Sequence, residues 1–144
     1  MQDSDFKSLE HHCKGYKIVL KGGELSKGYK PDVVLKQENN YIILESEHSS
    51  SRKHILGGMV KAAKYLTGER KGCLVVVLQL KKNTTVDQIR NHLGQYLSWL
   101  KDMTNLKDVY VISDVNYCKN INCRPIELLS DKFNKSASKV ESSI

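Results

Sequence analysis

The 144-residue sequence has no apolar run long enough to cross a lipid bilayer. Its longest apolar run, Cys73 to Leu78, has the length of a strand, whereas a membrane-spanning helix needs about 20 apolar residues. The first residues, Met-Gln-Asp-Ser-Asp, lack the basic and apolar segments of a signal peptide. We therefore expect a cytoplasmic protein with no membrane partner.

Cysteine is scarce too, with four residues in the whole chain. Cys118 and Cys123 have four residues between them, but the two closely spaced ligand pairs of a typical zinc site are missing. Cys73 opens an apolar segment, where a thiol is expected to be a small buried hydrophobe. Unpaired thiols are favoured, and a zinc site formed with upstream histidines stays open as an alternative.

Negative charge is the sign in short supply, since 23 Lys and Arg face 16 Asp and Glu and leave a net charge of +7. A basic protein of this size suggests a polyanionic partner such as DNA. The length and the lack of internal repeats fit one domain over residues 1–130, followed by a polar, flexible tail over 131–144. We expect no small-molecule cofactor.

The pattern of apolar residues predicts an α/β fold, with an αβββαβ core and a mixed central sheet flanked by helices. Ser49 to Ser51 supply N-cap candidates for the helix after the third strand. The expected elements are a helix over 3–14, strands over 16–21, 32–37 and 41–47, a helix to about 66, a strand over 73–80, a helix to about 103 and a strand over 108–114.

The second and third strands carry the most informative residues. If Asn39-Asn40 is a two-residue turn, Asp32 lies opposite Glu47. Alternate residues of a strand face the same side, so Glu45 joins them, and Ile43 on that face indicates that the acids emerge from a buried sheet. Clustered carboxylates are unfavourable unless a cation neutralises them, and Mg²⁺ suits such ligands. The alternative is that both glutamates simply face solvent.

The order Pro31-Asp32, a hairpin, Glu45-Ser46-Glu47, a helix and an apolar strand resembles the PD-(D/E)XK, restriction-endonuclease-like superfamily over about residues 3–80. This resemblance implies that Asp32 and Glu45 bind Mg²⁺, with Mn²⁺ as a substitute. It also implies that the last motif residue positions or activates the attacking water. The superfamily often has an acidic residue on the first helix, and Glu10 is the candidate for this further metal ligand.

The sequence departs from the superfamily at Glu47, where lysine is commonest and some restriction enzymes have Glu or Gln. Glu47 is a candidate general base or additional ligand. Alternatively the following helix supplies a catalytic lysine, with Lys53 the nearest candidate. The basic residues on or near that helix are candidates for phosphate contacts, or they form an ordinary solvated face; they are Arg52, Lys53, Lys61 and Lys64.

Together these features predict a Mg²⁺-dependent DNA endonuclease that hydrolyses phosphodiester bonds. It would resemble a restriction enzyme or a resolvase or repair nuclease, and a homodimer would cut one strand per subunit. The alternatives on the same fold are a catalytically inactive nucleic-acid-binding module, which the missing motif lysine favours, and a subunit of a larger defence complex.

Overall fold

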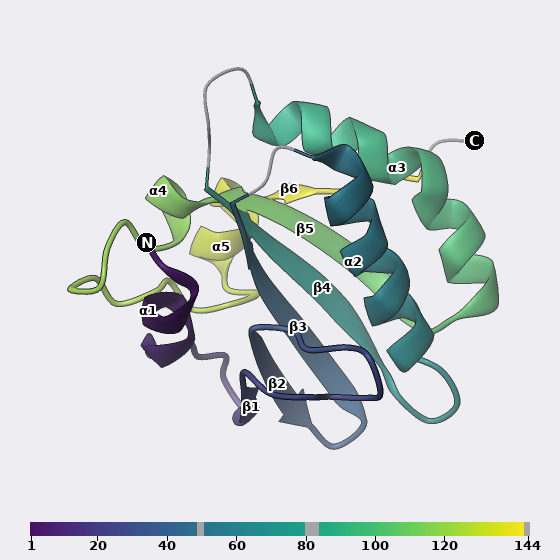
Figure 1. Ribbon diagram of the computed structural model, residues 1–144, viewed down its shortest axis with the longest axis horizontal. Coiled ribbons are helices and arrows are strands. Elements are labelled where there is room, and N and C mark those ends of the chain that lie inside the picture. Colours follow the sequence, from purple (N-terminus) through teal and green to yellow (C-terminus); the bar gives the residue numbers. More distant parts are fainter. Residues whose placement is uncertain (49–50, 80–83, 143–144) are drawn as a thin grey trace.

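The computed structural model describes residues 1–48, 51–79 and 84–142 (Figure 1). Six strands form one sheet in the order β1-β2-β3-β4-β5-β6. Strands β1 to β3 are antiparallel, β3 to β5 are parallel, and β6 is antiparallel to β5. The α/β class and the mixed sheet are therefore confirmed. The strands are β1 (Lys17–Lys21), β2 (Val33–Gln37), β3 (Asn40–Glu47), β4 (Lys71–Leu78), β5 (Leu106–Ser113) and β6 (Ser138–Lys139).

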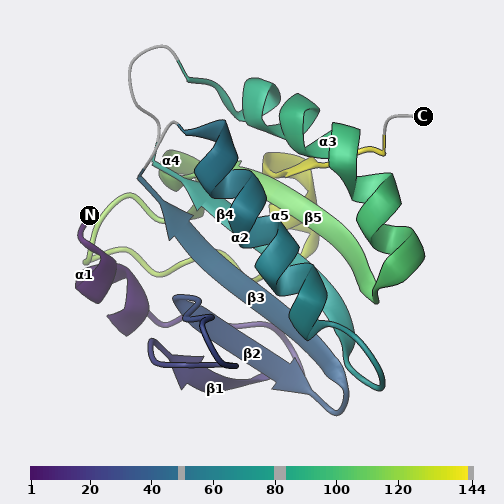
Figure 2. The ribbon, with the colours of Figure 1, turned by 45° about the vertical axis from the view of Figure 1, so that its right-hand side comes forward.

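Helices cover both faces of this sheet (Figures 1 and 2). The crossover helices α2 (Arg52–Tyr65) and α3 (Val86–Met103) pack on one face, as parallel neighbouring strands require. The opposite face carries α1 (Asp3–Ser8), α4 (Asp114–Tyr117) and α5 (Asp131–Ser136). In the described part of the chain, no helix combines the length and the apolarity that crossing a bilayer demands.

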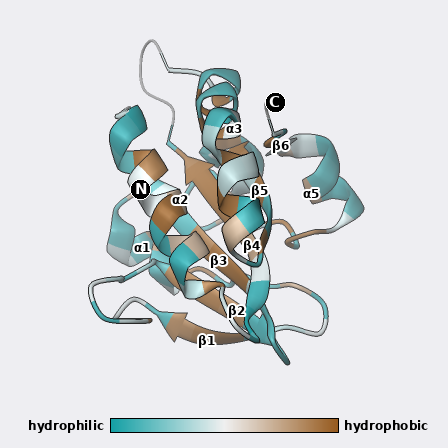
Figure 3. Ribbon diagram, turned by 90° about the vertical axis from the view of Figure 1, so that its right-hand side faces the viewer, coloured by the Kyte–Doolittle hydropathy of each residue, from teal (hydrophilic) through white to brown (hydrophobic). Residues whose placement is uncertain are grey.

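The two faces of the sheet have separate apolar cores, and Figure 3 shows the central strands as predominantly hydrophobic. Ile43 belongs to the core that contains Met59 of α2 and Leu97 of α3, whereas Leu44 belongs to the core on the other side, with Phe133 of α5. Odd-numbered residues of β3 therefore face α2. Glu45 and Glu47 continue the face of Ile43, as the sequence predicts.

The predicted register of the hairpin is wrong by two residues. The turn is formed by Glu38 and Asn39, so Gln37 pairs with Asn40 and Val33 with Leu44. Glu38 takes a φ of +55°, which places a left-handed residue at the first central position of the turn. Continuing this register places Asp32 opposite Glu45 instead of Glu47. A shift of two residues preserves the faces, so the acids still lie on one side.

The N-terminal helix is shorter than the predicted span of 3–14. It ends at Ser8 because the backbone of Leu9 is extended. The buried imidazole of His11 also contacts the Phe6 carbonyl oxygen, which the next backbone N–H of a longer helix would otherwise use. His11 Nε2 lies 2.7 Å from the carbonyl oxygen of Phe6, and Nδ1 lies 2.6 Å from the hydroxyl of Tyr117. The ring thereby joins α1 to α4 across more than one hundred residues of sequence.

The C-terminal segment also differs from its prediction as a tail. Residues up to 142 include α5 and β6, and Phe133 and Val140 are buried in the two cores. Single apolar residues within a Ser- and Lys-rich stretch gave too weak a period to indicate these elements. Of the predicted N-cap serines, Ser51 caps α2; Ser49 and Ser50 lie outside the described residues, as do Leu80 and residues 143–144.

The buried His11 predicts a pH-dependent stability. Burial lowers the pKa of His11 to about 4, so the unfolded chain, with a pKa near 6.5, binds the proton more tightly. The stability contributed by neutral His11 is complete above about pH 6.5 and is lost as the pH falls toward 4. We expect the difference in unfolding free energy between wild type and His11→Gln to shrink by roughly 2 kcal/mol between pH 7.5 and 4.5, measured by urea denaturation. A difference that stays constant over this range would contradict the prediction.

Candidate functional site

Three carboxylates gather where β2 begins and β3 ends. The carboxylate of Asp32 accepts a hydrogen bond of 2.8 Å from the backbone N–H of Ser46, a residue beyond the last paired residues of β2 and β3. Its other oxygen lies 3.9 Å from Lys7 Nζ. The side chains of Asp32 and Glu47 are only 14% and 16% exposed. These acids are thus held by the sheet and largely withdrawn from water.

Burial and mutual repulsion make this cluster unfavourable as it stands. Burial, together with the charges of Asp32 and Glu47, raises the pKa of Glu45 to about 7, and the charge of Lys61 opposes this rise. Burial also raises the pKa of Asp32, against the effect of its hydrogen bond from Ser46. A bound cation would favour the ionised form of both side chains. The site therefore has the electrostatics of a cation-binding position.

Tyr29 adds a buried polar atom, its hydroxyl oxygen, to the same place. Residues Ser26 to Tyr29 form a tight turn in which the Tyr29 N–H donates to the Ser26 carbonyl at 2.9 Å, and Gly28 supplies the required positive φ of +80°. Tyr29 is 5% exposed, and its hydroxyl has no hydrogen-bond partner within the described residues. Burial and the nearby charges of Glu45 and Asp32 raise its pKa, so the hydroxyl stays protonated and able to donate.

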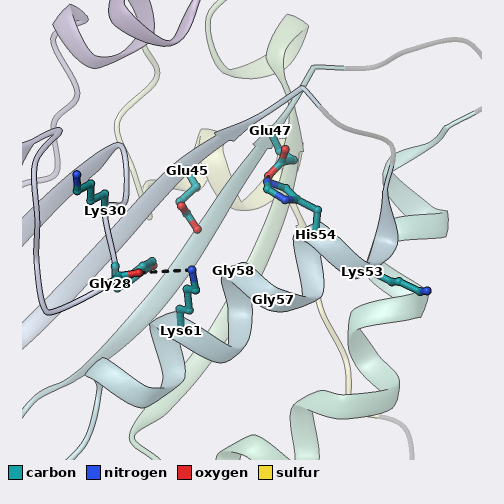
Figure 4. A pocket seen from close by; sticks show the side chains of 10 residues that line it. Gly28, Lys30, Glu45, Glu47, Lys53, His54, Gly57, Gly58 and Lys61 are labelled. Atoms are coloured by element: carbon teal, nitrogen blue, oxygen red, sulfur yellow. Dashed lines mark hydrogen bonds and ion pairs between the residues drawn. The ribbon is translucent and has the colours of Figure 1, made fainter.

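Helix α2 presents one face to the acids (Figure 4). Ser51 caps this helix by accepting from the His54 N–H, which orients the first turn so that His54 Nε2 lies 3.5 Å from Glu47 Oε2. One turn later, a Cβ added to Gly58 would lie 3.1 Å from Glu45 Oε2. Glycine at this position makes room for the carboxylate. Glycine is conformationally unfavourable within a helix, and the room it leaves for Glu45 explains why it stands at this position.

Lys61 follows on the same face. Its Nζ lies 3.5 Å from the Gly28 carbonyl oxygen, and its charge lowers the pKa of Glu45. Acids, tyrosine, histidine and lysine thus surround one open depression of about 580 Å³. The depression is lined by Gly28, Tyr29, Lys30, Glu45, Glu47, Lys53, His54, Gly57, Gly58 and Lys61.

The other predicted site residues are placed as follows. Lys53 lines the depression at its rim, but its side chain points away from the acids (Figure 4). Arg52 is exposed at the start of α2, and Lys64 lines a neighbouring depression near the end of that helix. Glu10 follows α1 and lines a different depression with Ile121 and Arg124. The structure therefore does not bring Glu10 together with Glu45.

Sequence reasoning missed Tyr29 and His54, although a signal for His54 was present. At about 100° per residue, His54, Gly58 and Lys61 fall within about 60° of one another around the helix, whereas Lys53 is about 80° from Lys61. Choosing a lysine by its distance along the sequence selected Lys53; choosing by helical period would have selected Lys61. No comparable signal identifies Tyr29, because its position depends on the fold of a loop.

The donor set can be compared with what a metal ion requires. Within residues 1–48, 51–79 and 84–142, no group of three or more His, Cys, Asp or Glu side chains converges as a complete metal cage. Glu45 instead lines an open depression, and Asp32, whose charge acts on Glu45, adds a second carboxylate. Mg²⁺ is commonly held by one or two carboxylates together with waters and substrate phosphates. The two acids fit that mode of binding.

No protein-family model matches the chain, and no curated protein matches its sequence. One solved structure with a distant likeness is SfsA from Pyrococcus furiosus, determined in complex with Ca²⁺. The identity is 9% and the TM-score 0.39, with 91% of this chain and 57% of the SfsA chain covered. The chain thus spans little more than half the length of that protein. Its function has to be inferred from its own side chains.

Proposed function

We propose that this protein is a Mg²⁺-dependent endonuclease of the PD-(D/E)XK type that hydrolyses phosphodiester bonds in DNA. The observation that carries the proposal is that Glu45, Lys61 and the Tyr29 hydroxyl, which has no partner among the described residues, meet at one depression, with Asp32 near enough for its charge to raise the pKa of Glu45. Two acids alone would suit a solvated strand end. A buried hydroxyl beside them, with no partner in the part of the chain that the structure describes, indicates space for a polar ligand.

Asp32 and Glu45 would hold the ion, because the hairpin register, continued by one pair, places them opposite each other, and burial strengthens their attraction to a cation. When bound, Mg²⁺ would act as a Lewis acid toward the scissile phosphate and would lower the pKa of a water bound to it. The chain's own groups have the remaining tasks. Lys61 would stabilise negative charge that develops on the phosphate, and the Tyr29 hydroxyl would donate to a phosphate oxygen or to a water.

Glu47 and His54 form a pair suited to proton transfer. With His54 Nε2 3.5 Å away, Glu47 would accept a proton from the attacking water and pass that proton to the exposed neutral imidazole. This assignment gives a role to glutamate at the position where the superfamily most often has lysine. Lys61 of α2 would then stabilise the phosphate charge in place of a lysine at position 47. A homodimer that cuts both strands remains a prediction.

The proposal is tested by nicking of supercoiled plasmid with Mg²⁺, Mn²⁺ or EDTA. Wild type should convert the plasmid to open-circular or linear DNA only with a divalent ion. Asp32→Asn keeps an oxygen that can accept from Ser46 but removes the charge, so we expect a rate loss on the order of 10³-fold. The matched control is Asp108→Asn, which removes the carboxylate of β5 that pairs with Lys139 of β6. This variant should cut like wild type. Absence of cleavage on supercoiled, linear and single-stranded DNA would reject an endonuclease in favour of a binding module.

A further inference from the structure

A second depression adjoins the site and differs from it in charge. It shares Gly28, Tyr29 and Lys61 with the first depression and continues along α2 to the end of that helix. Its remaining lining residues are Ser26, Lys27, Lys64, Tyr65, Thr67 and Arg70. Among the described residues that line it there is no Asp or Glu. Four cations, Lys27, Lys61, Lys64 and Arg70, therefore face one groove without a carboxylate on its walls.

The far end of this groove is held in place. The guanidinium of Arg70 lies 4.3 Å from the centre of the Tyr65 ring, and Arg70 Nε donates to the Tyr65 carbonyl at 2.7 Å. The Tyr65 ring packs edge-on against Tyr41 of β3, with ring centres 5.4 Å apart. A cation fixed in this way loses little conformational freedom when an anion binds.

We infer that this groove, lined by Lys27, Lys61, Lys64 and Arg70, binds the phosphodiester backbone of one DNA strand and leads it into the acidic site. The inference rests on the proposed function, since it gives the substrate its path. From His54 to Tyr65 the helix rises about 16 Å. That length accommodates roughly four or five nucleotides at about 3.4 Å each. The path runs toward the C-terminal end of α2, away from Arg52 and the outward-pointing Lys53.

The charges suit phosphates rather than an apolar or a cationic partner. Four cations without a carboxylate on the same walls repel one another, and a polyanion relieves this repulsion while releasing its counterions. Lys61 lines both depressions, so one side chain would contact the strand in the groove and the phosphate beside Glu45. The groove thereby orders the strand relative to the carboxylates.

The experiment measures binding of a fluorescein-labelled 20-mer by anisotropy at several salt concentrations, in EDTA so that cleavage does not interfere. Lys27→Gln/Lys64→Gln should lower affinity by roughly 10- to 60-fold at 0.1 M salt and reduce the slope of log K against log salt by about 2 for duplex DNA. Lys132→Gln/Lys135→Gln removes the same charge from exposed positions on α5 and should bind like wild type. Equal losses in the two double variants would overturn the inference.

Parallel arms identify the ligand and separate this inference from the proposed function. Single-stranded DNA, RNA and poly-glutamate of matched charge are tested with the same variants; an affinity for poly-glutamate equal to that for DNA would overturn the assignment to a nucleic-acid backbone. If groove variants lose binding while wild type never cuts with Mg²⁺, the groove stands and the nuclease proposal fails. If wild type cuts and groove variants bind and cut equally well, the groove assignment alone fails.

Discussion

Glu45→Gln is expected to abolish Mg²⁺-dependent cleavage and, in the same variant, to make the metal-free protein more stable above pH 7. The loss of cleavage should be on the order of 10³-fold or more, because a neutral amide is a much poorer ligand for Mg²⁺ than a carboxylate. The gain in stability has a separate cause. In the metal-free protein, Glu45 carries a negative charge that burial and two neighbouring acids oppose.

The pH dependence of this gain follows from the raised pKa. Glu45 titrates at about 7 in the folded protein and at 4.5 in the reference state, so the folded protein binds the proton more tightly. The stability associated with that proton is complete below pH 4.5 and is lost as the pH rises through 7. Relative to wild type, Glu45→Gln should therefore gain roughly 2 kcal/mol or more at pH 8.5 and almost nothing at pH 4.5.

Thermal and urea unfolding with and without Mg²⁺ measure both effects. Mg²⁺ should raise the Tm of wild type at pH 8, because a ligand that binds only the native state stabilises that state. The Tm of Glu45→Gln should not change, because this variant lacks a ligand for the ion. Glu69→Gln changes an exposed glutamate in the same way and is the control for altered net charge. A Glu45→Gln protein that cuts normally, or whose stability relative to wild type does not vary with pH, would contradict this role of Glu45.

Much of this arrangement could be predicted because strand alternation is robust. The prediction that Asp32, Glu45 and Glu47 share a face depended only on which residues of each strand point to the same side. A register error of two residues leaves those sides unchanged, so the prediction held. The error itself arose at Glu38, whose positive φ is uncommon for a glutamate. Pattern alone favoured Asn39 and Asn40, which adopt such conformations more readily.

The remainder depended on contacts between segments far apart in sequence. Tyr29 reaches the acids because the turn at Gly28 folds over α2, and the linear sequence contains no period that encodes this contact. His11 similarly ends α1 through a hydrogen bond to Tyr117 and a contact with the Phe6 carbonyl. Local propensity predicts neither, since both depend on tertiary packing.

The second large effect is expected at Lys61. Lys61→Met should lower kcat by on the order of 10²- to 10³-fold, because removing a preorganised cation beside the scissile phosphate has a cost of this size. Lys53→Met should remain within about threefold of wild type, since that side chain points away from Glu45. The two substitutions make the same chemical change two turns apart on one helix. Their comparison therefore isolates the direction in which the lysine points.

Single-turnover cleavage at saturating DNA separates this effect from weaker binding. Lys61 also lines the basic groove, so Lys61→Met should lose roughly 8-fold in affinity at 0.1 M salt as one lost phosphate contact. The larger loss should stay in the cleavage step after saturation, and Lys61→Arg, which keeps the charge, should recover part of it. If saturation restores the wild-type rate to Lys61→Met, the lysine serves binding alone. If Lys53→Met is instead the inactive variant, the lysine nearest in sequence is the one that acts, and the face of α2 assigned to the site is wrong.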